Sequence, residues 1–176
     1  MRFVHVPIMF LLTFLAVTPV MAETQNRTAE ALEVLKRFSG VWETRTRIRH
    51  EGPPAREFKT RGRATCRPTL EGRYFEFRTQ TIPPGQADLQ VMTYDVEADV
   101  YRQWLFGSDG YRHEAEGQWN PASSTLRWQG KTVDASFVIE DRWVSPDRLE
   151  WTLLRKDAKG RTVQAIEGTL IRIKEQ

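Results

Sequence analysis

The sequence has only one cysteine, Cys66, and no long apolar run beyond its first 22 residues. A single cysteine excludes an intramolecular disulfide, so the fold must be held together by its core. We interpret Cys66 as a small buried hydrophobic side chain. Because a membrane-spanning helix needs about 20 apolar residues, the absence of such a run predicts no transmembrane anchor.

Charge of one sign is never concentrated in a block. The 26 Lys and Arg residues are interspersed with 23 Asp and Glu residues, and the formal net charge is only +3. Proteins that bind nucleic acid gather their basic residues on one face or in one run. The sequence therefore predicts no nucleic-acid partner.

Known catalytic and metal-binding motifs are also absent. The sequence has no Gly-x-Ser-x-Gly, no His-Glu-x-x-His and no phosphate-binding glycine loop. His50 and His113 are not spaced as a ligand pair and belong to no His/Cys cluster, which disfavours a metal ion or a haem. A nucleophilic pair of Cys66 and His113 would need a third group to orient it. We predict no catalytic residue, no metal site and no cofactor, so the chain is more consistent with a non-enzyme.

The first 22 residues have the features of a secretory signal. A basic Arg2 precedes an apolar stretch, and Val20-Met21-Ala22 suits a signal peptidase. We therefore expect a cleaved signal peptide at 1–22 and export to the periplasm or the extracellular medium. The rest is the size of one domain, with an N-terminal segment and capping helix at 23–39 and a β-barrel at 40–176.

A short helix is predicted at the start of the mature chain. From Thr28 to Phe38 the apolar residues recur at helical spacing and the charged residues lie elsewhere. Ser39-Gly40 is a typical helix end.

After Gly40 the hydrophobic period changes from 3.6 to 2, which is the period of half-buried strands. Roughly ten such runs follow, joined by turns rich in Gly, Pro and Asn, and together they indicate an antiparallel meander that closes into a barrel. After Asp134, apolar residues occur at both the even-numbered and the odd-numbered positions, so the pattern does not define the inward face. Either Asp141 or Arg142 could therefore point inward. The inward positions are expected to be Trp42, Thr44, Thr46, His50, Phe58, Thr60, Phe75, Phe77, Tyr111, His113, Trp119, Trp128, Asp141, Trp143 and Trp151.

The stretch "FSGVW", after a short helix and at the head of the first strand, resembles the Gly-x-Trp entrance of lipocalin and fatty-acid-binding (calycin) barrels. In those families the Trp closes one barrel end, and an Arg on the last strand packs over it. The matching residues here are Gly40, Trp42 and Arg172. A cation over an indole contributes about 0.5–2 kcal/mol. The resemblance implies an all-β, antiparallel up-and-down, lipocalin-like barrel of roughly 8–10 strands with a short N-terminal helix.

The middle of the chain is similar to a family of secreted bacterial lipocalin-like domains whose function is unassigned. The shared pattern is a Tyr-Asp before a hairpin, a Tyr and a Trp after it, and a later Glu-Gly-x-Trp. In this sequence these residues are Tyr94, Asp95, Tyr101, Trp104, Glu116, Gly117 and Trp119.

An aromatic interior with a few polar groups is typical of a small-molecule site. We therefore expect a barrel that binds a small, largely apolar ligand, which can carry an anionic group. One alternative is a filled barrel that acts as an envelope or assembly module through an exposed patch around Tyr94, Trp104 and Phe106. Another alternative is an enzyme whose site lies at the barrel mouth. The sequence does not indicate the oligomeric state. The expected ligand-binding residues are His50, Phe58, Phe75, Phe77, Tyr111, His113, Trp119 and Trp128.

Overall fold

The computed structural model of the chain describes residues 19–83 and 85–174. The predicted signal segment, 1–22, lies outside the described residues except for its last four positions. Within the described part, one α-helix is followed by ten β-strands. The bounds are α1 Pro19–Lys36, β1 Gly40–His50, β2 Arg56–Thr69, β3 Tyr74–Ile82, β4 Ala87–Asp95, β5 Val100–Gly107, β6 Arg112–Asn120, β7 Thr125–Lys131, β8 Ala135–Ser145, β9 Arg148–Asp157 and β10 Thr162–Arg172.

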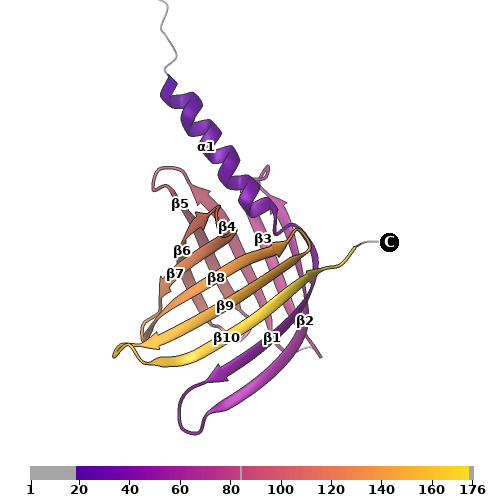
Figure 1. Cartoon of the computed structure of the whole chain (residues 1–176), viewed down its shortest axis with the longest axis vertical. Coiled ribbons are helices and arrows are strands. Elements are labelled where there is room, and N and C mark those ends of the chain that lie inside the picture. The colour runs from indigo at the N-terminus through magenta and orange to yellow at the C-terminus, as the bar shows by residue number, and fades with distance from the viewer. Residues whose placement is uncertain (1–18, 84, 175–176) are drawn as a thin grey trace, which may run out of the picture.

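The ten strands form one closed antiparallel barrel (Figure 1). Each strand pairs with its neighbours in sequence, and β10 pairs with β1 to close the ring. The predicted up-and-down barrel is therefore confirmed, with a strand number at the upper end of the predicted range. Closure leaves no unpaired sheet edge to be protected.

The alternation of side chains along the strands separates an inner from an outer face. In β6, His113 and Ala115 are buried whereas Glu114 and Glu116 are exposed. In β8, Asp141 is buried and its neighbour in sequence is exposed, which settles the register that the sequence left open. The inward group there is the carboxylate, not Arg142.

The helix α1 begins nine residues before the predicted start at Thr28 and ends at Lys36. Residues 20–27 contain no glycine or proline that would interrupt a helix. Pro19 stands at the first helical position, where its missing N–H costs nothing.

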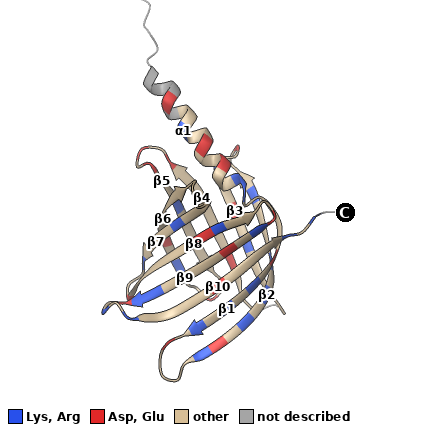
Figure 2. Ribbon diagram, in the orientation of Figure 1, with Lys and Arg blue, Asp and Glu red and all other residues tan. Residues whose placement is uncertain are grey.

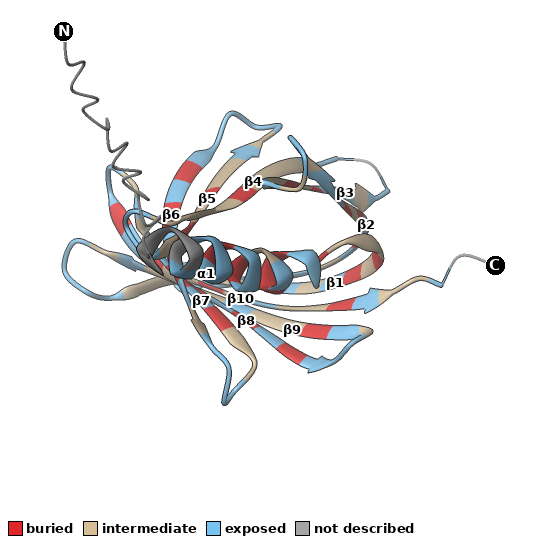
Figure 3. Ribbon diagram, turned by 90° about the horizontal axis from the view of Figure 1, so that it is seen from above, coloured by how far each residue is buried: buried red, intermediate tan, exposed pale blue. Residues whose placement is uncertain are grey.

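The barrel end beside α1, which we call the closed end, is filled by side chains. Phe38 follows the helix, and its ring lies 6.1 Å from that of Phe77 and 4.6 Å from that of Trp143. Trp42 and Leu126, also near this end, are fully buried. Seen from above, α1 crosses the barrel opening (Figure 3).

The opposite end, which we call the far end, is not covered in this way. Phe58 and Tyr111 lie on inward-facing positions there, yet they are 47% and 36% exposed. Thr46, Thr60 and Leu105 also face inward and remain only half-buried. The interior is thus packed at the closed end and reached by solvent at the far end.

Candidate functional site

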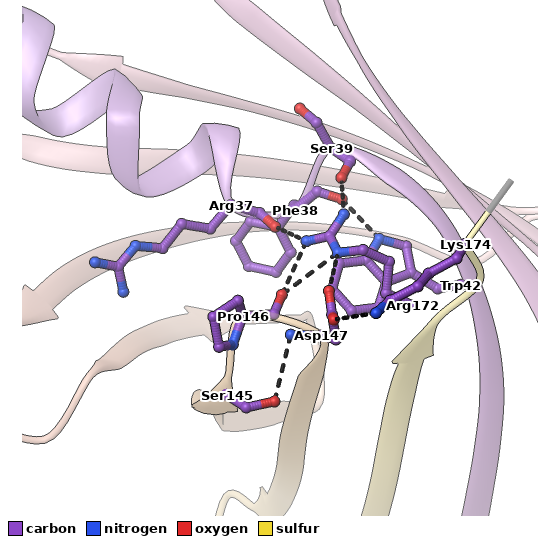
Figure 4. A network of polar contacts seen from close by, with 9 residues as sticks. All are labelled: Arg37, Phe38, Ser39, Trp42, Ser145, Pro146, Asp147, Arg172 and Lys174. Carbon is purple, nitrogen blue, oxygen red and sulfur yellow. Dashed lines mark hydrogen bonds and ion pairs between the residues drawn. The ribbon is translucent and has the colours of Figure 1, made fainter.

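The closed end is built around Trp42 and Arg172 (Figure 4). Trp42 is completely buried, and its indole N–H donates a hydrogen bond of 2.7 Å to the carbonyl oxygen of Phe38. The guanidinium carbon of Arg172 lies 4.1 Å from the centre of the indole ring. Residues at the head of β1 and at the end of β10 therefore close the barrel together with the end of the helix.

Arg172 also holds three separate chain segments at this end (Figure 4). Its guanidinium donates to the carbonyl oxygens of Arg37 at 2.9 Å, of Pro146 at 3.1 Å, and of Ser39. An ion pair of 3.1 Å to Asp147 completes the network. The side chain thus links the end of α1, the β8–β9 turn and the last strand.

Gly40 is required at this position for two reasons. Its φ angle is +123°, which side-chain-bearing residues rarely adopt. A Cβ atom there would lie 2.6 Å from Nη1 of Arg172. Glycine therefore lets the chain turn from helix to strand while the guanidinium lies directly above it.

The structure distributes the predicted ligand-binding residues over both ends of the barrel. Phe75, Phe77 and Trp128 are buried in the main hydrophobic cluster. Trp119 packs against that cluster, 5.7 Å from the ring of Trp143. These four residues contribute to the packed part of the interior.

His50 and Phe58 lie at the tip of the β1–β2 hairpin at the far end. Their rings are 6.0 Å apart, and both side chains are exposed. They are close to each other but are not enclosed by other side chains.

Tyr111 and His113 lie together at the far end of β6. Their rings are 5.6 Å apart, and the ring of Phe137 lies 4.5 Å from that of His113. Arg155 from β9 lies over Tyr111 at 5.9 Å and donates a hydrogen bond of 2.8 Å to Asp134. This group of side chains forms one side of the far end.

Three inward glycines make room for aromatic rings along the inner wall. A Cβ atom at Gly117 would lie 2.5 Å from Trp128, and one at Gly130 would lie 2.2 Å from Phe137. A third at Gly168 would lie 2.1 Å from Trp151. Each ring therefore lies over a neighbouring strand where the side chain is missing, an arrangement known to rescue glycines in sheets.

Small side chains occupy much of the remaining inner wall. Thr44, Thr46, Ala64 and Ala115 all face inward near the middle of the barrel. A barrel of about eight strands is just wide enough to be filled by side chains or to hold one small ligand. This barrel has ten strands, two more than that number.

Asp141 is a carboxyl group inside the barrel. It is 9% exposed, and its Oδ2 accepts a hydrogen bond of 2.8 Å from the indole N–H of Trp128. Burial raises its pKa from 3.8 to about 7, and the hydrogen bond from Trp128 only partly opposes that rise. A buried carboxyl that titrates near neutral pH is a feature of functional sites.

Four further side chains on the inner wall have unpaired polar atoms, namely Gln103, His113, Trp143 and Arg155. Gln103 is 3% exposed and its Oε1 has no hydrogen-bond partner; His113 is 8% exposed and neither ring nitrogen has one. Burial lowers the pKa of His113 from 6.5 to about 4, so the ring is neutral at pH 7. Sequence reasoning missed Gln103, because its strand has apolar residues on both faces.

Cys66 and His113 lie at opposite ends of the barrel. Cys66 pairs with Gly40 at the closed end, and His113 pairs with Leu105 towards the far end. Burial raises the pKa of the Cys66 thiol to about 12. In the part of the chain that the structure describes, no three His, Cys, Asp or Glu side chains are grouped as metal ligands.

On the outer surface, the expected patch differs from the observed one. Trp104 and Phe106 face outward, where they pair with Val91 and Leu89. Tyr94 faces inward, with its ring 5.2 Å from that of Tyr101 and packed against the core. The expectation failed for Tyr94 because alternation along β4 places it on the same side as the buried Met92.

A concavity of about 630 Å³ lies mainly on the outer face of β2, β1, β10 and β9, and its lining includes four basic residues. Figure 2 shows Lys and Arg residues along β1 and β2. Arg45 and Arg47 in this concavity form ion pairs with Glu43 at 2.9 Å and with Glu57 at 3.4 Å. The inner wall is the stronger candidate site, because it holds Gln103 and His113 with their unpaired atoms. No helix among residues 19–83 and 85–174 has the length and apolarity needed to cross a membrane.

Comparisons with solved structures place this architecture among lipocalin-like barrels. The structure of Rv2717c from M. tuberculosis superposes with a TM-score of 0.62 at 13% sequence identity, covering 82% of this chain and 98% of that one. The S-type phycobiliprotein lyase CPES from Guillardia theta gives a TM-score of 0.54 at 14% identity, covering 90% and 99%. At these identities the likeness concerns the fold.

The sequence comparisons give the family. Residues 28–172 match the family described as "Protein of unknown function (DUF1579)", and the chain belongs to that family. No curated protein matches the sequence.

Proposed function

We propose that the protein is a small-molecule-binding barrel that holds a largely apolar ligand in its interior. The observation that carries the proposal is the inner wall, where Trp128, Phe137 and Trp151 lie against glycines and Gln103 and His113 have unpaired polar atoms. Apolar and aromatic walls with a few placed polar groups are typical of ligand pockets. The ligand enters from the far end, because the closed end is filled by Trp42 and Arg172.

The proposal includes export. The signal-like features of residues 1–22 support a mature chain that starts at residue 23 and works outside the cytoplasm. N-terminal sequencing of the protein from its own host tests this point. A chain that begins at residue 23 in the extracytoplasmic fraction supports export, and an intact Met1 in the cytoplasm contradicts it.

Native mass spectrometry of the protein purified gently from its host tests ligand binding. We expect a mass increment that disappears on denaturation and whose fragments identify the ligand. The matched variants are Thr46→Trp, which fills the interior, and Thr152→Trp, which places the same ring on the outer face. The increment should be lost in Thr46→Trp and kept in Thr152→Trp. An increment that Thr46→Trp retains, or no increment in the wild-type protein, would argue against a ligand inside the barrel.

A surface role is the second candidate, and the outward pairs of Trp104 with Val91 and Phe106 with Leu89 favour it. Apolar patches with charged surroundings often mark contacts with other proteins. Cross-linking in the host with a photoreactive group at residue 104 would trap such a partner. Cross-links at residue 104 but not at the outward residue 129 would support the surface role, and the absence of both would remove it.

A further inference from the structure

Gln103 and His113 are two neighbouring side chains of the inner wall that are at least nine-tenths buried and have unpaired polar atoms. Oε1 of Gln103 and both ring nitrogens of His113 lack hydrogen-bond partners within the described chain. Buried polar atoms in folded proteins nearly always have a partner, and leaving one unpaired costs stability. Two such groups side by side on one wall point to a partner that enters from outside the chain.

The two side chains are neighbours. Gln103 on β5 pairs with Ala115 on β6, and His113 lies two residues before Ala115. Gln103 and His113 are therefore diagonal neighbours on the same face of the β5–β6 pair. The amide of Gln103 is held in place because its Nε2 donates a hydrogen bond of 2.7 Å to Oε1 of Gln90. Phe137, 4.5 Å from the imidazole, borders the pair with an apolar ring.

The cation on this side of the far end, Arg155, is neutralised by Asp134, to which it donates a hydrogen bond of 2.8 Å, while its buried Nε has no hydrogen-bond partner within the described chain. The imidazole is neutral at pH 7, because burial lowers its pKa to about 4. A neutral imidazole offers one donor and one acceptor, and the free amide oxygen offers an acceptor only.

We propose that Gln103 and His113 form the polar subsite of the interior and bind an uncharged hydroxyl or carboxamide of a flat aromatic ligand. This inference rests on the proposed function and names its ligand class. A hydroxyl or carboxamide donates to the amide oxygen and accepts from the imidazole. A carboxylate cannot donate to the amide oxygen, and its burial is costly because Asp134 already neutralises Arg155. The flat part of the ligand packs on the half-buried ring of Trp151.

Three probes with the same ring system test the subsite by fluorescence titration of the purified protein at neutral pH. The first probe, 1-hydroxypyrene, has a neutral group that both donates and accepts a hydrogen bond. The second, 1-methylpyrene, has an apolar group of similar size, and the third, pyrene-1-carboxylate, is an anion. We expect 1-hydroxypyrene to bind about tenfold more tightly than 1-methylpyrene, which corresponds to about 1.4 kcal/mol. Pyrene-1-carboxylate should bind most weakly.

Two variants link the preference to the subsite. Gln103→Leu and His113→Phe should each reduce the preference for 1-hydroxypyrene to less than about threefold while 1-methylpyrene still binds. The matched control is Gln129→Leu on the exposed outer face of β7, which should leave the preference unchanged. In Gln103→Leu the loss of the unpaired oxygen is offset by the loss of the hydrogen bond of 2.7 Å to Gln90, so the melting temperature of the ligand-free protein should change little.

The outcomes separate this inference from the proposed function. If 1-methylpyrene binds and pyrene-1-carboxylate binds as well as or better than 1-hydroxypyrene, the uncharged subsite is wrong and interior binding stands. The same conclusion holds if the preference survives in both Gln103→Leu and His113→Phe. If none of the three probes binds, interior binding itself is contradicted.

Discussion

Replacing Arg172 by methionine should destabilise the protein strongly, although the residue lies near the chain end. Methionine keeps aliphatic contact with Trp42 but removes the guanidinium that lies 4.1 Å above the indole ring. It also removes the hydrogen bonds to three carbonyl oxygens and the ion pair with Asp147. The helix, the β8–β9 turn and β10 would lose their common contact.

The magnitude follows from the contacts. Loss of the cation over the indole costs about 0.5–2 kcal/mol. A hydrogen bond from a charged donor is worth about 1.5–3 kcal/mol, and we count one because the carbonyls at this end can be rehydrated. The free energy of unfolding should therefore fall by about 2–5 kcal/mol, which lowers the melting temperature by roughly 4–20 °C for a domain of this size.

The assay is urea unfolding followed by tryptophan fluorescence, with a scan of the melting temperature beside it. The matched control is Arg142→Met, because Arg142 forms only an exposed ion pair with Glu150 at 2.6 Å. Such pairs contribute about 0–1 kcal/mol. If Arg172→Met costs no more than Arg142→Met, the account of the closed end is wrong.

Three further predictions concern the interior. Gly168→Ala should destabilise the protein by about 1–3 kcal/mol and weaken probe binding, because the new Cβ atom would lie 2.1 Å from Trp151. The control Gly52→Ala should change neither stability nor probe binding, because no atom lies within 4 Å of its new Cβ. Cys66 is 2% exposed, and burial raises the pKa of its thiol to about 12. The thiol should therefore react with a disulfide reagent only after the protein is unfolded in urea. Fast reaction of the native protein would refute the burial of Cys66. Burial raises the pKa of Asp141 from 3.8 to about 7, so the contribution of this group to stability is lost as the pH rises from 3.8 to about 7. Burial lowers the pKa of His113 from 6.5 to about 4, so the contribution of the imidazole is lost as the pH falls from 6.5 to about 4. In urea unfolding, the stability of Asp141→Asn relative to wild type should therefore be higher at pH 7 than at pH 4. The stability of His113→Phe relative to wild type should be higher at pH 4 than at pH 7. Differences that do not change with pH would contradict both expectations.

The barrel could be predicted from the sequence because its signals are local. Alternation with period 2 between turn residues defines strands without reference to their partners. Gly40 and Trp42, at the point where the period changes, mark the entry into the first strand. The helix start was missed, since nothing in residues 20–27 distinguishes a helix from an extended leader.

The candidate site could be predicted only in part, because alternation does not report the position of a residue along the barrel axis. Phe58 and Trp128 both face inward, yet one is exposed at the hairpin tip and the other is completely buried. Gln103 could not be assigned to a face because Tyr101 and Trp104 make both sides of its strand aromatic. The contact of Trp151 with Gly168 depends on cross-strand register, which no local pattern encodes.

The most direct test of ligand binding inside the barrel is a fluorescence titration with 1-aminoanthracene, an uncharged aromatic probe, on three proteins. We predict saturable binding of one probe per chain by the wild-type protein and by Thr152→Trp. We predict at least about a tenfold loss of affinity in Thr46→Trp, where the new ring occupies the interior. Equal affinity in all three proteins, or a loss only in Thr152→Trp, would contradict a binding site inside the barrel.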